Sequence, residues 1–317
     1  MSEFTADDII DRRRLRRKLT FWRIAAFCVV LAGLFAIALA SLPEERFGAK
    51  SRPHIAKVRI DGMILEDEEM IEMLQGVGQN EAVKGVILAV NSPGGTTAGG
   101  EAIYEAVREL ADEKPVTAQI GTTGASAAYM IATATDHIVA RKTSMVGSIG
   151  VILQYPNVAD MLDKLGISME MLKSTPLKGE PSMFGEPVPG AEAMMRAVIL
   201  DSYQWFKDIV AERRDFSQTE IARLADGSVF TGRQALERKL IDALGGEDAA
   251  KEWLVDQGVD EDLKIVEWKK PEPGSDLILA GAVARWLGFN PGKKSPVEAI
   301  QQRLFLDGLI SVWHVDG

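Results

Sequence analysis

An unbroken run of uncharged, mostly apolar residues lies near the start of the chain, from residue 24 to residue 42. A helix rises about 1.5 Å per residue, so this run as a helix spans about 30 Å, the thickness of a bilayer's hydrocarbon core. Basic residues crowd the segment just before it, between Arg12 and Arg23. Because positive charge stays on the cytoplasmic side, the pattern predicts a single-pass anchor with the body outside the cytoplasm, as in a bacterial inner-membrane protein with a periplasmic domain.

Two other interpretations of the apolar run are a cleaved signal peptide and a buried soluble helix. Ala38 and Ala40 form an A-x-A-like cleavage site. The run is longer, however, than the apolar core of about 7 to 15 residues in a signal peptide. A buried soluble helix would carry a polar face, and this run has none. A retained anchor is therefore the favoured interpretation.

Beyond residue 53 the chain alternates between strand-like and helix-like segments. The stretch 54–65 alternates and is rich in β-branched residues, while 84–90 is a short apolar run suited to a strand buried on both faces. Repeated β-then-α units predict a largely parallel sheet wrapped by helices. The predicted strands are 54–65, 84–90, 115–120, 137–140 and 167–172. The predicted helices are 67–78, 101–112, 126–135, 158–165 and 192–214, with shorter helices as far as residue 257.

Two later segments depart from this alternation. Residues 173–190 are rich in proline and glycine, which predicts an irregular loop. Residues 271–317 mix apolar, Trp-containing segments of helical appearance with proline and glycine. The predicted organisation is a basic cytoplasmic segment, an anchor, a linker, one α/β domain and a helical tail, over residues 1–23, 24–42, 43–53, 54–270 and 271–317 in that order.

Composition excludes several kinds of site. The formal net charge is -10, so a nucleic-acid surface would need a local basic patch, and the patch that exists precedes the apolar run. The single cysteine, Cys28, lies inside that run and cannot form a disulfide or a thiolate metal cage within one chain. The sequence carries no glycine-rich phosphate loop and no metal-ligand spacing, so we expect neither a cofactor nor a metal.

Two small-residue motifs follow predicted strands. Asn91–Gly95 (NSPGG) comes directly after strand 84–90, where paired glycines allow a tight turn with exposed backbone N–H groups. Such a turn can aim a donor at an oxyanion, although an ordinary βα turn has the same composition. Ser126 stands in GASAA at a strand-to-helix junction, where the helix dipole and the N–H of Ala127 favour a developing negative charge. Serine is also a favoured helix N-cap, which is the plainer interpretation of that motif alone.

A serine nucleophile needs a base, and two residues could supply one. Lys178 lies in the irregular loop, and a lysine can act as a base where desolvation lowers its pKa toward the working pH. Most lysines in loops are simply solvated. His137 would instead give a Ser-His-Asp triad, although a histidine that begins a strand is more often structural.

The order of these motifs resembles signal peptide peptidase A in its shorter bacterial form. The matching stretches lie between residues 55 and 249 and are NSPGG, GASAAYMIATATDHIVA, GSIGV, LGISMEMLKSTPLKGEP and ADGSVFTGRQALERKLIDALGG. The resemblance implies a Clp-protease and crotonase-like ββα superhelix, here a serine peptidase domain over residues 54–270, that cleaves remnant signal peptides with a serine–lysine dyad. It places the nucleophile on Ser126, the general base on Lys178, and the oxyanion donors on the backbone N–H groups of Ala127 and of the Gly94–Gly95 pair, with Gly95 slightly preferred.

The resemblance also implies partners. These are apolar peptides, membrane lipid around residues 24–42, and further copies of the chain, since family members form dome-like homo-oligomers, an octamer among them. Which copy supplies Lys178 to a given Ser126 stays open. Family members often have Ser-Gly-Gly-Tyr where this chain has Ser126-Ala127-Ala128-Tyr129. Alanine keeps the backbone donor but narrows the space above it, so activity should survive while the preferred substrate side chain changes.

Three other functions fit parts of the pattern. A related membrane-bound serine protease acting on a specific membrane protein would differ only in its substrates. A catalytically silent peptidase-like scaffold is disfavoured by the presence of both Ser126 and Lys178. A crotonase-type acyl-CoA enzyme shares the architecture, but an extracytoplasmic location would remove its substrate.

Overall fold

The computed structural model describes residues 18–29, 33, 49–270 and 310–312. It divides into two units, Met1–Arg52 and Pro53–Gly317. In the first unit residues 18–29 are helical, and a short 3-10 helix, η2, spans Ala49–Ser51. Of the helices in the described residues, none is both long and apolar enough to cross a membrane. Most of the predicted anchor and most of the predicted helical tail lie outside the described residues and stay predictions. Residues 310–312 of that tail are described, and they form a strand and not a helix.

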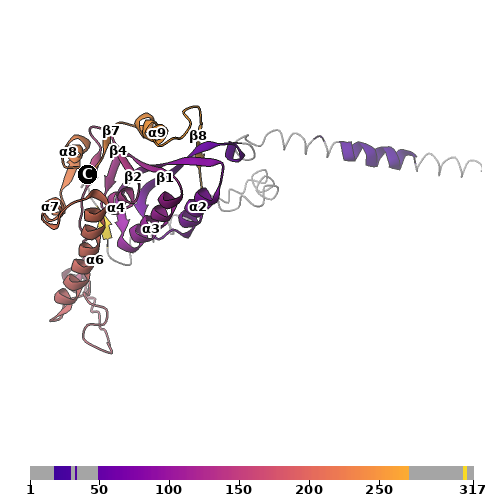
Figure 1. Ribbon diagram of the computed structural model, residues 1–317. Helices are drawn as coiled ribbons and strands as arrows, with labels where there is room; N and C mark the ends of the chain where they lie inside the picture. The colour runs from indigo at the N-terminus through magenta and orange to yellow at the C-terminus, as the bar shows by residue number, and fades with distance from the viewer. Residues whose placement is uncertain (1–17, 30–32, 34–48, 271–309, 313–317) are drawn as a thin grey trace, which may run out of the picture. The chain divides into compact units, whose positions relative to one another are not determined.

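Among its described residues, the second unit is built on a nine-stranded, largely parallel sheet whose main path runs β6-β5-β3-β2-β1-β8 (Figure 1). β4 lies beside β3 and pairs with β7, while β9 pairs with β2. The antiparallel pairings join β5 to β6 and β2 to β9. The strands are β1 (His54–Ile64), β2 (Val83–Thr96), β3 (Val116–Ala125), β4 (His137–Ala140), β5 (Met145–Gly147), β6 (Val229–Thr231), β7 (Ala243–Leu244), β8 (Ile265–Trp268) and β9 (Ile310–Val312).

Helices cover both faces of this sheet. Figure 1 shows α2, α3 and α4 on one face and α9 on the other, while α6 runs outward from the body. The helices are α2 (Glu68–Gln79), α3 (Thr97–Glu113), α4 (Ala127–Thr133), α5 (Ala159–Lys164), α6 (Ala191–Arg214), α7 (Gln218–Leu224), α8 (Gly232–Glu237) and α9 (Glu247–Asp256). The predicted mixed α/β architecture with a parallel sheet is therefore confirmed.

The apolar run of β2 is explained by burial on both sides of the sheet. Val86 and Leu88 belong to the core under α2, α3 and α4, whereas Ile87 packs with Leu254 of α9 on the opposite face. Side chains alternate across a strand, so a strand covered on both faces has to be apolar at successive positions.

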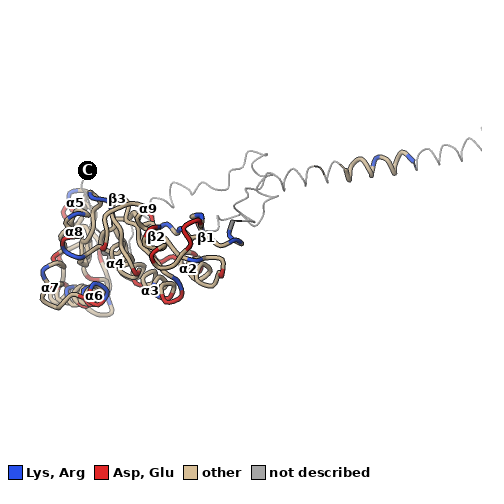
Figure 2. The backbone as a smooth tube through the Cα atoms, turned by 45° about the horizontal axis from the view of Figure 1, so that its top comes forward, with Lys and Arg blue, Asp and Glu red and all other residues tan. Residues whose placement is uncertain are grey.

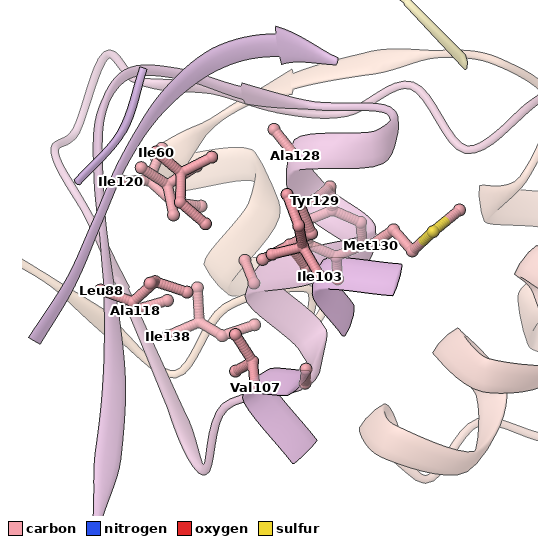
Figure 3. Packing of buried hydrophobic residues seen from close by; sticks show 14 of the residues in the cluster. Ile60, Leu88, Ile103, Val107, Ala118, Ile120, Ala128, Tyr129, Met130 and Ile138 are labelled. Atoms are coloured by element: carbon pink, nitrogen blue, oxygen red, sulfur yellow. The ribbon is translucent and has the colours of Figure 1, made fainter. Parts of the chain in front are cut away.

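The larger core joins the strands directly to the helix that follows Ser126. In Figure 3, Leu88 of β2 and Ala118 and Ile120 of β3 face the helices that carry Ile103 and Tyr129. Fully buried branched and aromatic side chains of this kind pack at close to crystalline density. The core thus fixes α4 against β2 and β3, which is the contact that positions the site.

Two predicted elements differ from the observed ones. β2 does not turn at Asn91–Gly95 but continues to Thr96. Near that point the pairing register of β2 shifts both with β1 and with β3. The predicted strand 167–172 is wrong, since these residues form no regular element. Its alternating side chains are exposed on both sides, with Ile167 and Met169 each 50% exposed. A strand needs a partner for its backbone groups, and the pattern of the sequence alone does not supply one.

Candidate active site

Ser126 occupies a strained bend between β3 and α4. Its backbone has φ 58° and ψ -124°, a conformation that non-glycine residues rarely adopt. The N–H of Ser126 donates to the carbonyl of Gly147 (2.8 Å), and its own carbonyl accepts from Met130 N–H (2.9 Å) in the first turn of α4. A sharp strand-to-helix bend of this kind is how many hydrolases present a nucleophile.

The plainer N-cap interpretation of Ser126 is wrong. Its side chain makes no capping hydrogen bond to α4, and its φ is positive, whereas an N-cap residue normally has extended backbone angles. Ser126 is only 1% exposed, and every residue of α4 is buried. The strained backbone of Ser126 is held by this buried surrounding structure.

The end of β2 lies beside this bend, because Ser92 of β2 pairs with Gly124 of β3. Gly94 has φ 111°, and its N–H donates to the buried Ser92 hydroxyl (3.0 Å). A Cβ on Gly95 would lie 1.8 Å from the carbonyl oxygen of Ile64 in β1, so only glycine fits there. The structure therefore places the end of β2 that carries Gly94 and Gly95 beside the end of β3 that leads into Ser126. It also engages the Gly94 N–H with the hydroxyl of Ser92, which sequence reasoning had not singled out.

β3 and α4, the two elements that flank Ser126 in the chain, contain no charged residue. From residue 116 to residue 135 the sequence has no Asp, Glu, Lys, Arg or His, and the tube of α4 is tan throughout in Figure 2. Tyr129 is the ionisable group of this stretch, and burial raises its pKa. Its hydroxyl donates to the carbonyl of Leu240 (2.8 Å). A base for Ser126 therefore has to come from another segment of the chain or from another copy.

Lys178 lies in an exposed turn, where its N–H donates to the carbonyl of Thr175 (3.2 Å). The loop is irregular, as predicted. In Figure 1 the chain between α5 and α6 lies at the outer end of α6, away from α4. The structure thus leaves Lys178 exposed while Ser126 is buried, and it does not place the lysine in the surroundings of the serine.

A buried carboxylate, Glu180, organises the loop that carries Lys178. It forms an ion pair with Lys173 and accepts hydrogen bonds from the N–H groups of Ser182 (3.3 Å) and Val188 (3.4 Å). The hydrogen bond from Lys173 lowers the pKa of Glu180, and the two backbone donors act in the same direction. Sequence reasoning missed Glu180. A glutamate among prolines can be a buried carboxylate that accepts backbone hydrogen bonds or a solvated surface charge, and the sequence does not distinguish the two.

Large apolar side chains are exposed just before this loop. Met161, Leu165, Ile167, Met169 and Leu172 are each at least 50% exposed. They lie within the short stretch 161–172, from α5 to the start of the loop, where charged and polar residues alternate with them. Exposed apolar patches of this kind mark surfaces for association.

His137 lies at the opposite end of the sheet from Ser126. It begins β4 and pairs with Thr117, near the start of β3, whereas Ser126 follows the last residue of β3. At about 3.3 Å per residue, the two ends of that strand are more than about 20 Å apart. The ring of His137 instead stacks on Trp253, with centroids 5.0 Å apart, and its Nδ1 lies 3.8 Å from Asp242. This geometry disfavours the Ser-His-Asp triad.

His137 should affect stability and not catalysis. Burial lowers the pKa of His137, against the opposing charge of Asp242, and Arg214 lowers it further. The unfolded chain then binds more protons below about pH 6.5, so the contribution of neutral His137 is lost as the pH falls through that value. We expect acidification from pH 7.5 to 5.5 to lower the melting temperature of the unchanged chain more than that of His137→Gln. The unchanged chain and His137→Gln should have equal peptidase activity at pH 7.5. A hundredfold loss of activity in folded His137→Gln would instead support the Ser-His-Asp triad.

Comparison with known proteins places these features in a family. A family model described as peptidase family S49 matches residues 108–260, and one described as Clp protease matches residues 62–149. A provisionally named protease of Methanocaldococcus jannaschii is 34% identical over 280 residues, which cover 84% of this chain and 89% of that relative. The chain belongs to peptidase family S49. The S49 match includes both Ser126 and Lys178, and the Clp protease match includes Gly94, Gly95 and Ser126.

Other S49 relatives agree with this assignment. A provisionally named protease of Synechocystis sp. is 34% identical over 231 residues, which cover 71% of this chain and 83% of that protein. A protein of Enterococcus faecium, provisionally named signal peptide peptidase SppA, is 29% identical over 275 residues, with 80% of this chain and 78% of the relative covered. The predicted resemblance and the predicted enzyme class are confirmed: this S49 chain is a serine protease with a Clp protease-like domain. The roles of Ser126, Lys178, Gly94, Gly95 and Ala127 stay predictions.

Proposed function

We propose that this S49 peptidase is a membrane-anchored serine endopeptidase that degrades remnant signal peptides, with Ser126 as the nucleophile and Lys178 as the general base. The observation that carries the proposal is the strained bend at Ser126, which is held beside the end of β2 and does not cap its helix. A strained conformation persists only where the surrounding structure enforces it, and such strain clusters at active sites.

In the proposed mechanism, the neutral amine of Lys178 takes the proton from the Ser126 hydroxyl. The serine oxygen attacks the peptide carbonyl carbon, and a tetrahedral intermediate forms. The C–N bond then breaks, and the lysine ammonium returns the proton to the leaving amine. Water attacks the resulting acyl ester as one of its protons passes to Lys178. The ester bond to Ser126 then breaks, the lysine ammonium returns that proton to the serine oxygen, and the new carboxyl end is released.

The oxyanion of the tetrahedral intermediate is held by two backbone donors in this proposal. Ala127 is the first residue of α4, so its N–H has no partner from within that helix and points along the helix dipole. Gly95 is the second donor. Gly94 is the weaker candidate of the glycine pair, because its N–H already donates to Ser92.

The base has to lose its contact with water before it can act, and an exposed Lys178 has not done so. Covering the exposed apolar segment around Leu165 and Leu172 with a further copy of the chain would shield the adjacent loop. We therefore include a homo-oligomer in the proposal, in which the apolar surface is the contact. The proposal also includes the anchor and the substrate. Residues 24–42 hold the enzyme in the inner membrane with its catalytic domain on the periplasmic side. The catalytic domain is then close to apolar peptides, which are the proposed substrates.

The test is to incubate the full chain in detergent with synthetic signal peptides and to map the products by mass spectrometry. We expect cuts within the apolar cores of the peptides and covalent labelling of Ser126 by a fluorophosphonate. A charged, soluble peptide of equal length serves as the comparison substrate and should be cut more slowly. Equal cutting of both peptides would contradict the substrate class, while absence of labelling at Ser126 would contradict the nucleophile.

A further inference from the structure

A buried ion pair closes the loop that carries Lys178. Lys173 pairs with Glu180, seven residues further along the chain, and the two side chains are only 19% and 2% exposed. Between them the N–H of Lys178 donates to the carbonyl of Thr175 (3.2 Å). The N–H of Glu180 donates to the carbonyl of Leu177 (3.3 Å). The ion pair therefore fixes both ends of a short turned segment that presents Lys178.

The carboxylate of Glu180 also holds the far side of the loop. Its Oε2 accepts hydrogen bonds from the N–H groups of Ser182 (3.3 Å) and Val188 (3.4 Å). The carbonyl of Val188 in turn accepts from the N–H of Ala191, the first residue of α6 (3.0 Å). Glu180 thus links the turn that presents Lys178 to the start of a helix.

The loop offers two lysines to this one buried carboxylate. Lys173 is paired with it, while Lys178 is exposed and has no carboxylate partner among the described residues. Burying a charge without a partner is costly, so Glu180 would draw in another cation if Lys173 were lost. Lys178 is the adjacent candidate, because only Gly179 lies between it and Glu180. Gly179 has φ 74°, with no atom within 4 Å of where a Cβ would lie, so the backbone has room to move there.

Other charged side chains of the surrounding elements lie in α5, just before the loop, within it and in the first turns of α6. They are exposed, and in the part of the chain that the structure describes they form ion pairs with neither Glu180 nor Lys178. These residues are Asp160, Asp163, Lys164, Glu170, Glu186, Glu192 and Arg196. The charge close to Lys178 therefore depends first on the Lys173–Glu180 pair.

We propose that Lys173 and Glu180 are positioning residues for Lys178, and that Lys173 keeps the buried carboxylate from pairing with the Lys178 amine. This inference rests on the proposed function, because it takes Lys178 as the general base. An amine beside a carboxylate keeps its proton to a pH about one to three units higher, and a protonated amine cannot accept the proton of a serine hydroxyl. With Glu180 already paired, Lys178 has only to lose its contact with water.

Lys173→Met tests this role, because it removes the amine and leaves the buried carboxylate. In the full chain, we expect the acid limb of the kcat/KM profile for an apolar peptide to move up by about one pH unit or more, which lowers activity at pH 7 about tenfold or more. Lys173→Met combined with Glu180→Gln should return the profile toward that of the unchanged chain, because no carboxylate is left to pair with Lys178. A shifted profile that does not return in the double variant overturns the proposal.

Three further variants control for side effects of the substitution. Lys173→Arg keeps the ion pair and should match the unchanged chain. Lys164→Met in α5 and Glu186→Gln in the same loop remove exposed charges and should leave the profile where it is. A shift in either of these two equal to that of Lys173→Met would overturn the proposal. Lys173→Gln takes the place of Lys173→Met if the apolar side chain prevents folding.

A second measurement does not depend on catalysis. Acetic anhydride acylates only neutral amines, so the rate at which it labels Lys178, read by mass spectrometry, reports how much of the amine is unprotonated. In chains that also carry Ser126→Ala, Lys173→Met should slow the labelling of Lys178 at pH 7, and the double variant should restore it. The exposed Lys142 is the internal reference.

The labelling separates failure of this inference from failure of the proposed function. Equal labelling of Lys178 in all variants overturns the positioning role, even if the enzyme is active. Slower labelling in Lys173→Met, with restoration in the double variant, supports that role. If the pH profile of activity then stays unmoved, the ion pair acts on Lys178 as proposed, and the assignment of Lys178 as the general base is what fails.

Discussion

Replacing Ser126 by alanine is expected to lower kcat/KM for an apolar reporter peptide by at least about a thousandfold. The substitution removes the oxygen that forms the acyl intermediate, while the buried methyl group keeps the packing around the bend. Activity is measured by release of a fluorophore from the peptide, and folding by circular dichroism and the melting temperature. Ser202→Ala, at a partly exposed position on α6, is the control and should keep full activity.

Ser126→Gly adds a readout of the backbone strain. This variant should be as inactive as Ser126→Ala but more stable than it by about 1 kcal/mol, because glycine adopts a φ near 58° without steric cost. The melting temperatures of the two variants make the comparison. Substantial activity in either variant would contradict the assignment of the nucleophile, and a lower melting temperature for the glycine variant would contradict the strained bend.

Replacing Lys178 by methionine is expected to cause the second large loss of peptidase activity. Methionine keeps an unbranched side chain but has no amine to take the serine proton, so we expect a loss comparable to that of Ser126→Ala. Lys178→Arg should be equally inactive, because a guanidinium stays protonated. Lys164→Met, in the last turn of α5, is the matched control and should remain active. Activity within tenfold of the unchanged chain in folded Lys178→Met would mean that the base is another group.

The same variants identify the copy that supplies the base. Lys178 is exposed on the chain that carries it, while Ser126 is buried. If the lysine acts on a neighbouring copy, mixing Ser126→Ala with Lys178→Met and reassembling the mixture should recover part of the activity. A mixture that stays inactive places the dyad within one chain.

The order of strands and helices could be predicted from the spacing of apolar residues along the sequence. β1, β2 and β4 lie in a sheet with a hydrophobic core on each face, so their buried positions have to be apolar. The strand predicted at 167–172 failed for the opposite reason: its side chains alternate, yet its backbone pairs with no strand in the part of the chain that the structure describes. Candidate chemistry at Ser126 could be predicted from its small neighbours and its position after a strand. Its positive φ could not, since strain is imposed by the packing of distant segments.

The contacts around the candidate site could be predicted even less, because they depend on parts of the chain that are distant in sequence or on the exact backbone geometry. The engagement of the Gly94 N–H by Ser92 needed the observed backbone, because the same five residues also suit an ordinary turn. The pairing of β9 with β2 had no local signal either, since the tail was predicted as helical and the pairing is set by an edge that another strand vacates. The buried Glu180 was hidden by a loop composition typical of solvated segments.

The helix that follows the nucleophile is tied to parts of the chain far downstream. Tyr129 donates to the carbonyl of Leu240, and the N–H of Ser148 donates to the carbonyl of Ser228 (2.8 Å), one residue beyond the Gly147 carbonyl that holds Ser126. A minimal catalytic fragment therefore has to extend past residue 240. Trimming the polypeptide after α7 would remove the support of the reactive bend, even though every residue assigned to the chemistry would still be present.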